Sequence, residues 1–233
     1  MKVNGIDIRK FNAKQLTVDL HPPNIAVKSE WVEGAAIPHE FQTQVQYGTL
    51  KLTILFRGSG RSEIIRSVSE FLSLMVKRSE LQLDGYKGIY VGDMTSDGIE
   101  KTRIPTRYIL TLQFNGYMTD TEVVNIYRGV PGAKFTTLGT REAPCIIEVM
   151  PLASMQRYVI SGFGEDDIIL SNLTKGEAVT IDGKKGTVTE NGVNKFDDCD
   201  IWEFPILVPG VENSITFSSA HCDITVRYNP MWL

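Results

Sequence analysis

The second half of the chain is a series of short alternating segments, and this series limits the possible folds more than any other feature of the sequence. Each segment places apolar side chains at every second position and ends in turn residues. The segments cover residues 143–151, 156–162, 166–173, 177–182, 186–192, 202–210, 213–220 and 222–230. No stretch with helical spacing interrupts them. The pattern predicts an antiparallel β-sandwich of about eight strands.

The run Asp-Gly-Lys-Lys-Gly at residues 182–186 can be interpreted as a phosphate-binding loop or as the corner of a sheet. Val179 and Ile181 alternate with polar neighbours before it, and Val188 lies between threonines after it. Asp182-Gly183 and Asn191-Gly192 are dipeptides that accept the positive φ of tight turns. We therefore interpret residues 173–196 as three short strands joined by two turns.

The first half of the chain combines strands with one helix. Residues 47–58 and 107–117 alternate cleanly, and residues 81–94 form a hairpin-like pair. Residues 61–79 change to helical spacing, with Ser62 as the expected N-cap. The apolar positions of this helix and of the two alternating strands are Leu50, Leu52, Ile54, Phe56, Ile64, Ile65, Val68, Phe71, Leu72, Met75, Tyr108, Leu110, Leu112 and Phe114. This pattern predicts an amphipathic helix that lies on a sheet.

A domain boundary is expected in residues 127–144, which are rich in Gly, Pro and Thr and show weak periodicity. We predict an N-terminal α+β domain at residues 1–135 and a C-terminal sandwich at residues 136–233. Charge follows the same division, with 17 basic against 14 acidic side chains up to residue 135 and 7 against 14 beyond it. The expected fold is mainly β with one helix.

Composition excludes several classes of protein. The net charge of −4 argues against a general nucleic-acid binder. No apolar run approaches the ~20 residues of a membrane helix, and no secretory signal is seen, so we expect synthesis in a cytoplasm. Cys145, Cys199 and Cys222 are odd in number and lack a CxxC pair, which predicts free thiols in or near a core.

Each motif that suggests a site has a simpler structural explanation. Residues 56–62, FRGSGRS, approach the helix like a phosphate loop but lack the Lys-Ser/Thr of a P-loop. His21, His39 and His221 have no metal-ligand spacing. The carboxylates Asp197, Asp198, Asp200 and Glu203 lack the spacing of a calcium loop and are expected to be a solvated turn. We predict no catalytic residues, no cofactor-binding residues, no metal site and no enzymatic activity.

Aromatic residues on a sandwich can stack on sugar rings, and Trp202, Tyr158 and Phe163 are the candidates. Aromatic side chains in strands more often belong to the core. A carbohydrate-binding module for cell-surface glycan is an alternative function for such a sandwich. A hydrolase that uses residues 197–203 is a third possibility, and it requires turnover that Asp198→Asn abolishes.

The order of elements and several phrases resemble the distal tail protein family of siphovirus-type bacteriophages and prophages. The phrases are GTLKLTILFRGSGRSEIIRSVSEFLSLM, LQLDGYKGIYVG, YILTLQFNGY, VISG, IILSNLTKGEAVTIDGKKGTVTENGVNKF, FPILVPGVENSITF and DITVRYNPMWL. They extend over nearly the whole chain. The resemblance implies a galectin-like C-terminal sandwich and an N-terminal (belt) domain that builds a homo-hexameric ring, with two rings back to back in some phages.

The resemblance also implies a structural virion protein of the tail tip. Such a ring links the major tail tube protein to a tail-associated hub or lysin protein and to host adhesion, and DNA leaves through its channel. A receptor-binding protein is a further expected partner, and host adsorption is the expected process. Ring closure requires heterologous contacts, which unpaired strand edges can supply. Leu50–Phe56 and Tyr108–Phe114 are the candidate edge strands.

Overall fold

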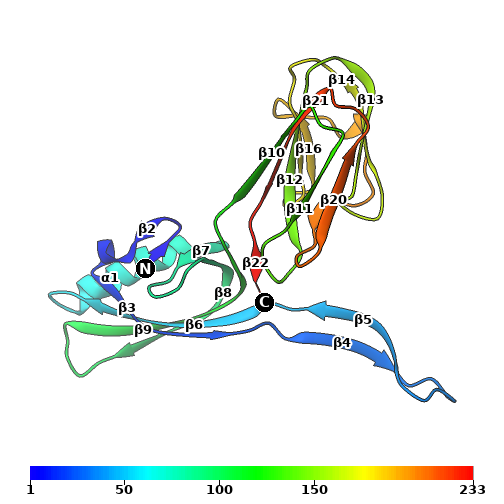
Figure 1. Ribbon diagram of the computed structural model, residues 1–233. Coiled ribbons are helices and arrows are strands. Elements are labelled where there is room, and N and C mark those ends of the chain that lie inside the picture. Colours follow the sequence, from blue (N-terminus) through cyan, green and yellow to red (C-terminus); the bar gives the residue numbers. More distant parts are fainter. Residues whose placement is uncertain (233) are drawn as a thin grey trace. The chain divides into compact units, whose positions relative to one another are not determined.

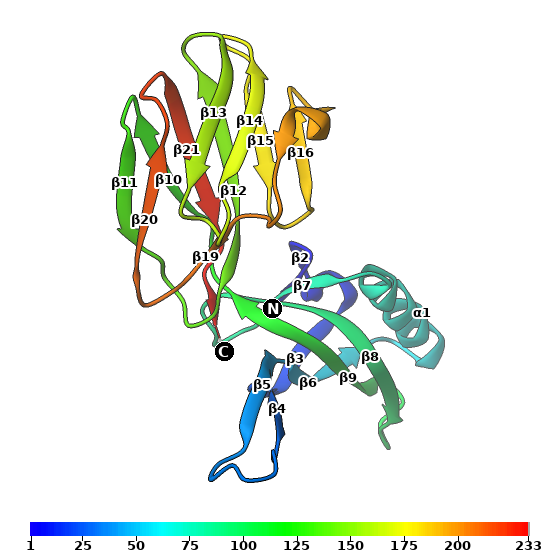
Figure 2. The same ribbon diagram turned by 90° about the vertical axis from the view of Figure 1, so that its right-hand side faces the viewer.

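A computed structural model describes residues 1–232 and divides them into two compact units, Met1–Thr119 and Asp120–Trp232. Figures 1 and 2 show the ribbon in two views. Each unit has its own hydrophobic core. The expected class, mainly β with one α-helix among the described residues, is confirmed.

The first unit contains one long antiparallel sheet, one α-helix and a separate hairpin. Its elements are β1 (Lys2–Val3), β2 (Ile6–Asp7), η1 (Ile8–Phe11), β3 (Ala13–His21), β4 (Ile25–Glu30), β5 (His39–Val45), β6 (Gly48–Arg57), α1 (Arg61–Leu72), η2 (Ser73–Met75), β7 (Ser79–Gln82), β8 (Ile89–Lys101) and β9 (Arg107–Thr119). The sheet has the order β2-β1-β7-β8-β9-β6-β3, and β4 pairs with β5 alone.

The alternation in β6 and β9 produces the core of this unit as predicted. The two strands pair from Gly48↔Gly116 to Arg57↔Arg107, which brings their apolar positions to one face. These are Leu50, Leu52, Ile54, Phe56, Tyr108, Leu110, Leu112 and Phe114, all buried. Both strands lie inside the sheet, so the prediction that one of them is an edge is wrong. In the strand order, β3 and β2 occupy the edges instead.

Helix α1 buries Ile64, Val68 and Phe71, and Phe71 packs edge-on against Phe56 of the sheet at 5.5 Å between ring centroids. Met75 of η2 is also buried, whereas Ile65 is 52% exposed. The expected N-cap at Ser62 is wrong, because the helix begins at Arg61 and its cap is Gly60, two residues before Ser62. The donors that precede the helix are satisfied by Glu63 instead. Its carboxylate accepts hydrogen bonds from the Ser59 backbone N–H at 2.8 Å and from the Ser59 hydroxyl.

The second unit is a sandwich of two antiparallel sheets. Its elements are β10 (Val123–Arg128), β11 (Gly132–Thr136), β12 (Ala143–Pro151), β13 (Met155–Ser161), β14 (Ile168–Leu173), β15 (Val179–Asp182), β16 (Thr187–Glu190), β17 (Val193–Asn194), η3 (Phe196–Asp198), β18 (Cys199–Asp200), β19 (Ile206–Leu207), β20 (Glu212–Phe217), β21 (Cys222–Tyr228) and β22 (Met231–Trp232). One sheet has the order β10-β21-β12-β15-β16-β17, and the other has the order β11-β20-β13-β14-β18.

The division between the units differs from the predicted boundary at residue 135. Residues 123–135, which the prediction assigned to the N-terminal domain and in part to the boundary region 127–144, contribute to β10 and β11 of the sandwich. β10 pairs with β21 from Val123↔Tyr228 to Arg128↔Asp223, and β11 pairs with β20 from Gly132↔Thr216 to Thr136↔Glu212. The glycines and the proline in this region interrupt the alternation, although cross-strand pairing still holds both strands in the sheets.

The stretch from 173 to 196 folds as three strands and two turns, as its pattern predicts. Asn191 and Gly192 have φ of 47° and 80°, as expected for the tight turn between β16 and β17. In the first turn the positive φ belongs to Gly186, at 67°, and not to Asp182-Gly183. Gly183 is required for space instead, since a Cβ there would lie 2.6 Å from the carbonyl oxygens of Cys145 and Pro205. Among the described residues no helix has the length and apolar character needed to cross a membrane.

Candidate functional site

The most exposed apolar surface of the first unit is the arm, which we define as residues 22–47 with strands β4 and β5. It extends the β3–β6 ladder away from the sheet as a two-stranded ribbon (Figures 1 and 2). Pro22 and Pro23 lack backbone N–H groups, so the ladder of β3 stops there and a separate pairing begins. The Gln46 N–H donates to the Asn24 carbonyl at 2.9 Å and closes the base of the arm.

One face of the arm is apolar although no described residue covers it. Ile25 pairs with Val45 and Val27 pairs with Thr43, so these four side chains share that face. Ile25 is 59% exposed and Phe41, at a register shift in β5, is 64% exposed. A two-stranded hairpin is at best marginally stable alone in water. Exposed apolar side chains on a marginally stable hairpin are typical of an element that a partner covers.

The tip of the arm combines an aromatic residue with negative charge. Trp31 is 64% exposed, and Val32 and Ile37 are exposed beside it in sequence. Residues 29–40 contain three glutamates, Glu30, Glu33 and Glu40, and no lysine or arginine. Within residues 1–232 none of these carboxylates forms an ion pair that would neutralise it. The tip is an acidic, aromatic surface.

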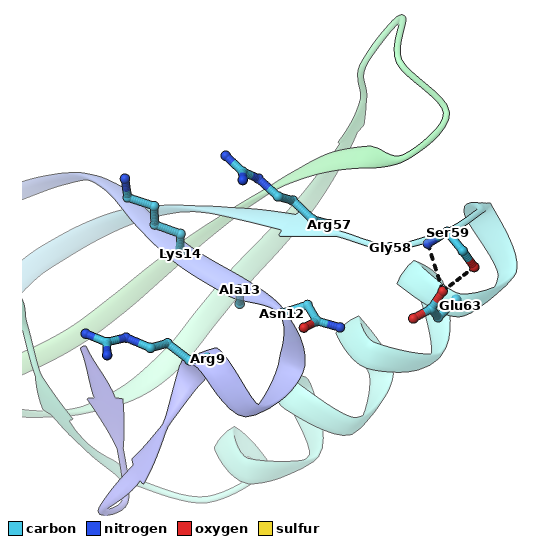
Figure 3. Close-up of a pocket in the computed structure, with 8 residues that line it drawn as sticks. All are labelled: Arg9, Asn12, Ala13, Lys14, Arg57, Gly58, Ser59 and Glu63. Carbon is cyan, nitrogen blue, oxygen red and sulfur yellow. Dashed lines mark hydrogen bonds between the residues drawn. The ribbon is translucent and has the colours of Figure 1, made fainter.

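A basic hollow of about 580 Å³ lies at the other end of the same ladder (Figure 3). It is lined by Arg9, Asn12, Ala13, Lys14, Arg57, Gly58, Ser59 and Glu63. Arg9 and Lys14 come from η1 and the start of β3, and Arg57 ends β6. Hydrogen bonds from the Ser59 N–H and hydroxyl lower the pKa of Glu63, which keeps this carboxylate ionised.

The cations of the basic hollow have little compensation among the described residues. Arg9 approaches Asp7 only at 3.9 Å, with 85% of its side chain exposed. Lys14 and Arg57 have no carboxylate partner in the part of the chain described. Arg57 stands directly opposite Arg107 across β6 and β9, an arrangement of like charges that is unfavourable without an anion between them. The FRGSGRS segment thus borders an anion-attracting surface, but its own donors are occupied by Glu63.

The sheet face opposite α1 is polar. Lys51, Gln113 and Asn115 are exposed on it, and Thr53 and Thr111 are half-buried between them. Lys51 stands opposite Asp19 of β3, so the two charges offset each other. No described element of the first unit packs on this face in the manner of α1. Around Lys51 and Asp19 this face is hydrophilic and nearly neutral.

The acidic residues that were considered for catalysis or calcium binding make separate contacts in the sandwich. Asp198 accepts a hydrogen bond from the Asn172 amide at 2.9 Å and approaches Lys195 Nζ at 3.3 Å, while Glu203 accepts one from the Glu165 N–H at 3.4 Å. No group of three His, Cys, Asp or Glu side chains in the described chain can hold a metal ion. The acidic residues are divided between structural contacts and solvent.

Two of the three proposed sugar-stacking residues are unsuitable, because Tyr158 is 0% exposed and Phe163 only 3%. Trp202 is 81% exposed. The three cysteines are free, as predicted, with Cys145 and Cys222 buried. Desolvation raises the pKa of all three thiols, that of Cys199 and Cys222 to about 11, which makes them weak nucleophiles.

Comparison with known proteins shows which class of protein the sandwich resembles. Residues 138–232 match the family model of the siphovirus-type tail component, C-terminal domain. No curated protein matches. The structure superimposes on that of the Dit protein of phage SPP1, described as a paradigm of the hub adsorption apparatus in phages that infect Gram-positive bacteria, with a TM-score of 0.77 at 12% identity. That alignment covers 100% of this chain and 98% of the other.

A second similar structure is the phage P2 baseplate in its calcium-activated conformation. It aligns with a TM-score of 0.55 at 9% identity over 96% of this chain and 92% of the other. At these identities the structures establish the fold, and the family model establishes the kinship of the sandwich. Residues 138–232 match the siphovirus-type tail component domain, and the resemblance of the chain to distal tail proteins is confirmed.

Proposed function

We propose that this protein is a structural, non-enzymatic subunit of the ring at the distal end of a phage tail. In this role it links the tail tube to the host-adhesion apparatus and encloses the channel for DNA exit. Its partners are further copies of itself in a hexamer, alone or as two rings back to back, together with the tail tube protein, a tail-associated hub protein and a receptor-binding protein. It is made in the host cytoplasm and acts at the virion tail tip.

The exposed apolar arm is the observation that supports this function. Exposed aromatic and aliphatic side chains on a projecting hairpin are unfavourable in a protein that remains alone. Covering them with a neighbour removes that cost, and large aromatic residues such as Trp31 and Phe41 are the residue types that dominate interface energies. If the arm docks on a different surface of the next copy, the contact is heterologous, and such contacts generate a ring when the rotation between copies closes.

The polar sheet face suits the wall of a channel. Proteins that hold DNA do so mainly through basic side chains on its phosphates. Lys51 with Asp19 opposite, among threonine, glutamine and asparagine side chains, provides water-binding groups with little net charge. Such a wall lets DNA slide past without retaining it.

Replacing residues 25–45 with Asn-Gly tests the role of the arm. The variant keeps the pair Asn24–Gln46 at the base, where a two-residue turn fits. We expect a folded monomer with an unchanged unfolding transition, since no arm residue belongs to the buried core. Full-length protein is expected to form rings, seen by light scattering and negative-stain images in the presence of the tail tube protein. Ring formation by the armless variant would refute the proposal.

Glycan binding is the second candidate, and the exposure of Trp202 on the sandwich favours it. The indole can stack on a sugar ring only if nearby residues also contribute. If cell-wall glycan retains the protein on a column, Trp202→Ala should release it while the exposed, apolar Val193→Ala does not. Equal retention of both variants would exclude this function.

A further inference from the structure

The acidic tip of the arm and the basic hollow lie at opposite ends of the stretch formed by the β3–β6 pair and the arm. The chain runs from Lys14 at the hollow through β3 and β4 to Trp31 at the tip (Figure 1). At ~3.3 Å per strand residue this path spans on the order of 50 Å. A chain therefore cannot place its own arm tip in its own hollow, and only another copy can bring the two surfaces together.

We propose that the basic hollow of one copy receives the arm tip of the next copy, an inference that rests on the ring proposed above. The contact combines ion pairs with aromatic stacking. Arg9, Lys14 and Arg57 face the carboxylates of Glu30, Glu33 and Glu40, and the Trp31 indole stacks against a guanidinium in the hollow. The contact is head-to-tail, so each copy gives one arm and receives one.

Charge complementarity supports this pairing. The hollow gathers three cations without close carboxylate partners among the described residues, and the tip gathers three carboxylates without cationic partners there. A guanidinium beside an indole gains a cation–π attraction, which strengthens when water is excluded. An anion beside Arg57 also relieves its repulsion with Arg107.

The shape and the wall of the hollow agree with a protein side chain as its occupant. The hollow has a volume of about 580 Å³ and is broadly open to solvent, so a side chain on a projecting tip can reach it. Ala13 is buried, and Figure 3 shows the long side chains of Arg9, Lys14 and Arg57 projecting from the neighbouring segments; their aliphatic stems add apolar surface to the lining. Glu63 adds a negative charge to one side of the hollow. This charge repels a continuous polyanion such as nucleic acid along its whole length, whereas the arm tip can place its apolar centre there.

Charge reversal in the full-length protein tests the contact. Arg57→Glu and Glu33→Arg are each expected to weaken ring formation about tenfold in light-scattering titrations, and the two changes together should restore most of it, since each interface then contains the reversed pair. Trp31→Ala should weaken it by a similar factor. Arg66→Glu, an exposed arginine on α1, is the matched control and should have no effect.

Cysteine pairing provides a direct measurement of proximity. Both Ala36 and Ser59 are exposed, one at the arm tip and one in the hollow. Oxidation of a chain that carries Ala36→Cys and Ser59→Cys should yield a ladder of covalent oligomers on a non-reducing gel, while each single variant yields at most dimers. The native cysteines are poor competitors because burial raises the pKa of their thiols.

Three results would overturn the inference. Rings that form without covalent ladders show that the arm docks elsewhere, and this outcome leaves the ring function intact. Rings that persist in Arg57→Glu while a labelled DNA duplex loses its binding identify the hollow as a phosphate site instead. The absence of rings and of ladders at every concentration, with tail tube protein present, refutes the ring and the contact together.

Discussion

Lys195 connects three segments of the sandwich through its ammonium group. Only 7% of its side chain is exposed, and its Nζ donates to Glu190 Oε2 at 2.9 Å and to the Asn172 carbonyl at 3.1 Å, with Asp198 Oδ2 at 3.3 Å. A buried cation requires such partners, because loss of one leaves an uncompensated charge. The stretch between β14 and β18 thus serves stability, and its lysine is not free for chemistry.

Asp198→Asn is expected to remove part of the acid sensitivity of the sandwich. The hydrogen bond from Asn172 and the one from Lys195 lower the pKa of Asp198 below the ordinary value of 3.8. Its contribution to stability is therefore complete above 3.8 and is lost as the pH falls through the lower folded value. Urea unfolding at neutral pH should show wild type more stable than the variant, and the two should converge in acid, once the pH has fallen below the lowered pKa of Asp198. A difference that persists in acid would contradict this account.

Gly183→Ala should destabilise the sandwich. The added Cβ would lie 2.6 Å from two backbone carbonyl oxygens, so a strand must move, at a cost of roughly 1–3 kcal/mol. Gly98→Ala is the control, since a Cβ at that position meets nothing within 4 Å. Urea midpoints of the two variants provide the comparison. An unchanged midpoint for Gly183→Ala would show that the turn can relax.

The sequence predicts single residues well where periodicity decides their position. The buried positions of β6 and β9 follow from alternation alone. The requirement for Gly183 does not, because it depends on carbonyl groups that are distant in the sequence. Tyr158 and Trp202 illustrate the same limit, since both are aromatic residues in or near strands and only tertiary packing makes one buried and the other exposed.

At the scale of elements the arm is the part that sequence analysis missed. Two features of the sequence indicate the arm. Pro22-Pro23 end the pairing of β3, and apolar residues stand at every second position in Ile25 and Val27, with Phe41 on the returning strand. The buried hydrophobic pattern of a strand and the exposed pattern of an assembly arm are identical in sequence. Only the absence of a covering element in the fold distinguishes them.

The arm should be cleaved by trypsin in the free protein and protected in the ring. Lys28 lies in β4 on an exposed two-stranded ribbon, whose local opening costs little. Limited proteolysis followed by mass spectrometry should show cleavage after Lys28 in the monomer and little cleavage in assembled rings. Lys87, exposed in the turn between β7 and β8, serves as the internal reference. Equal cleavage of the arm in both states would show that assembly leaves it uncovered.

At the scale of the whole molecule the two cores are separate, and this separation makes the units testable one by one. The fragment of residues 120–233 should fold alone, whereas the fragment of residues 136–233 should not, because it lacks β10 and β11, which pair with β21 and β20. Circular dichroism during thermal unfolding should show one cooperative transition for the longer fragment only. Equal transitions for both would support the boundary near residue 135.

Negative-stain imaging of the full-length protein mixed with the tail tube protein tests the central claim most directly. The account predicts closed rings of uniform diameter with the wild-type chain and isolated particles with the variant that lacks residues 25–45. Wild-type protein that remains as single particles under these conditions, or armless protein that forms the same rings, would contradict it.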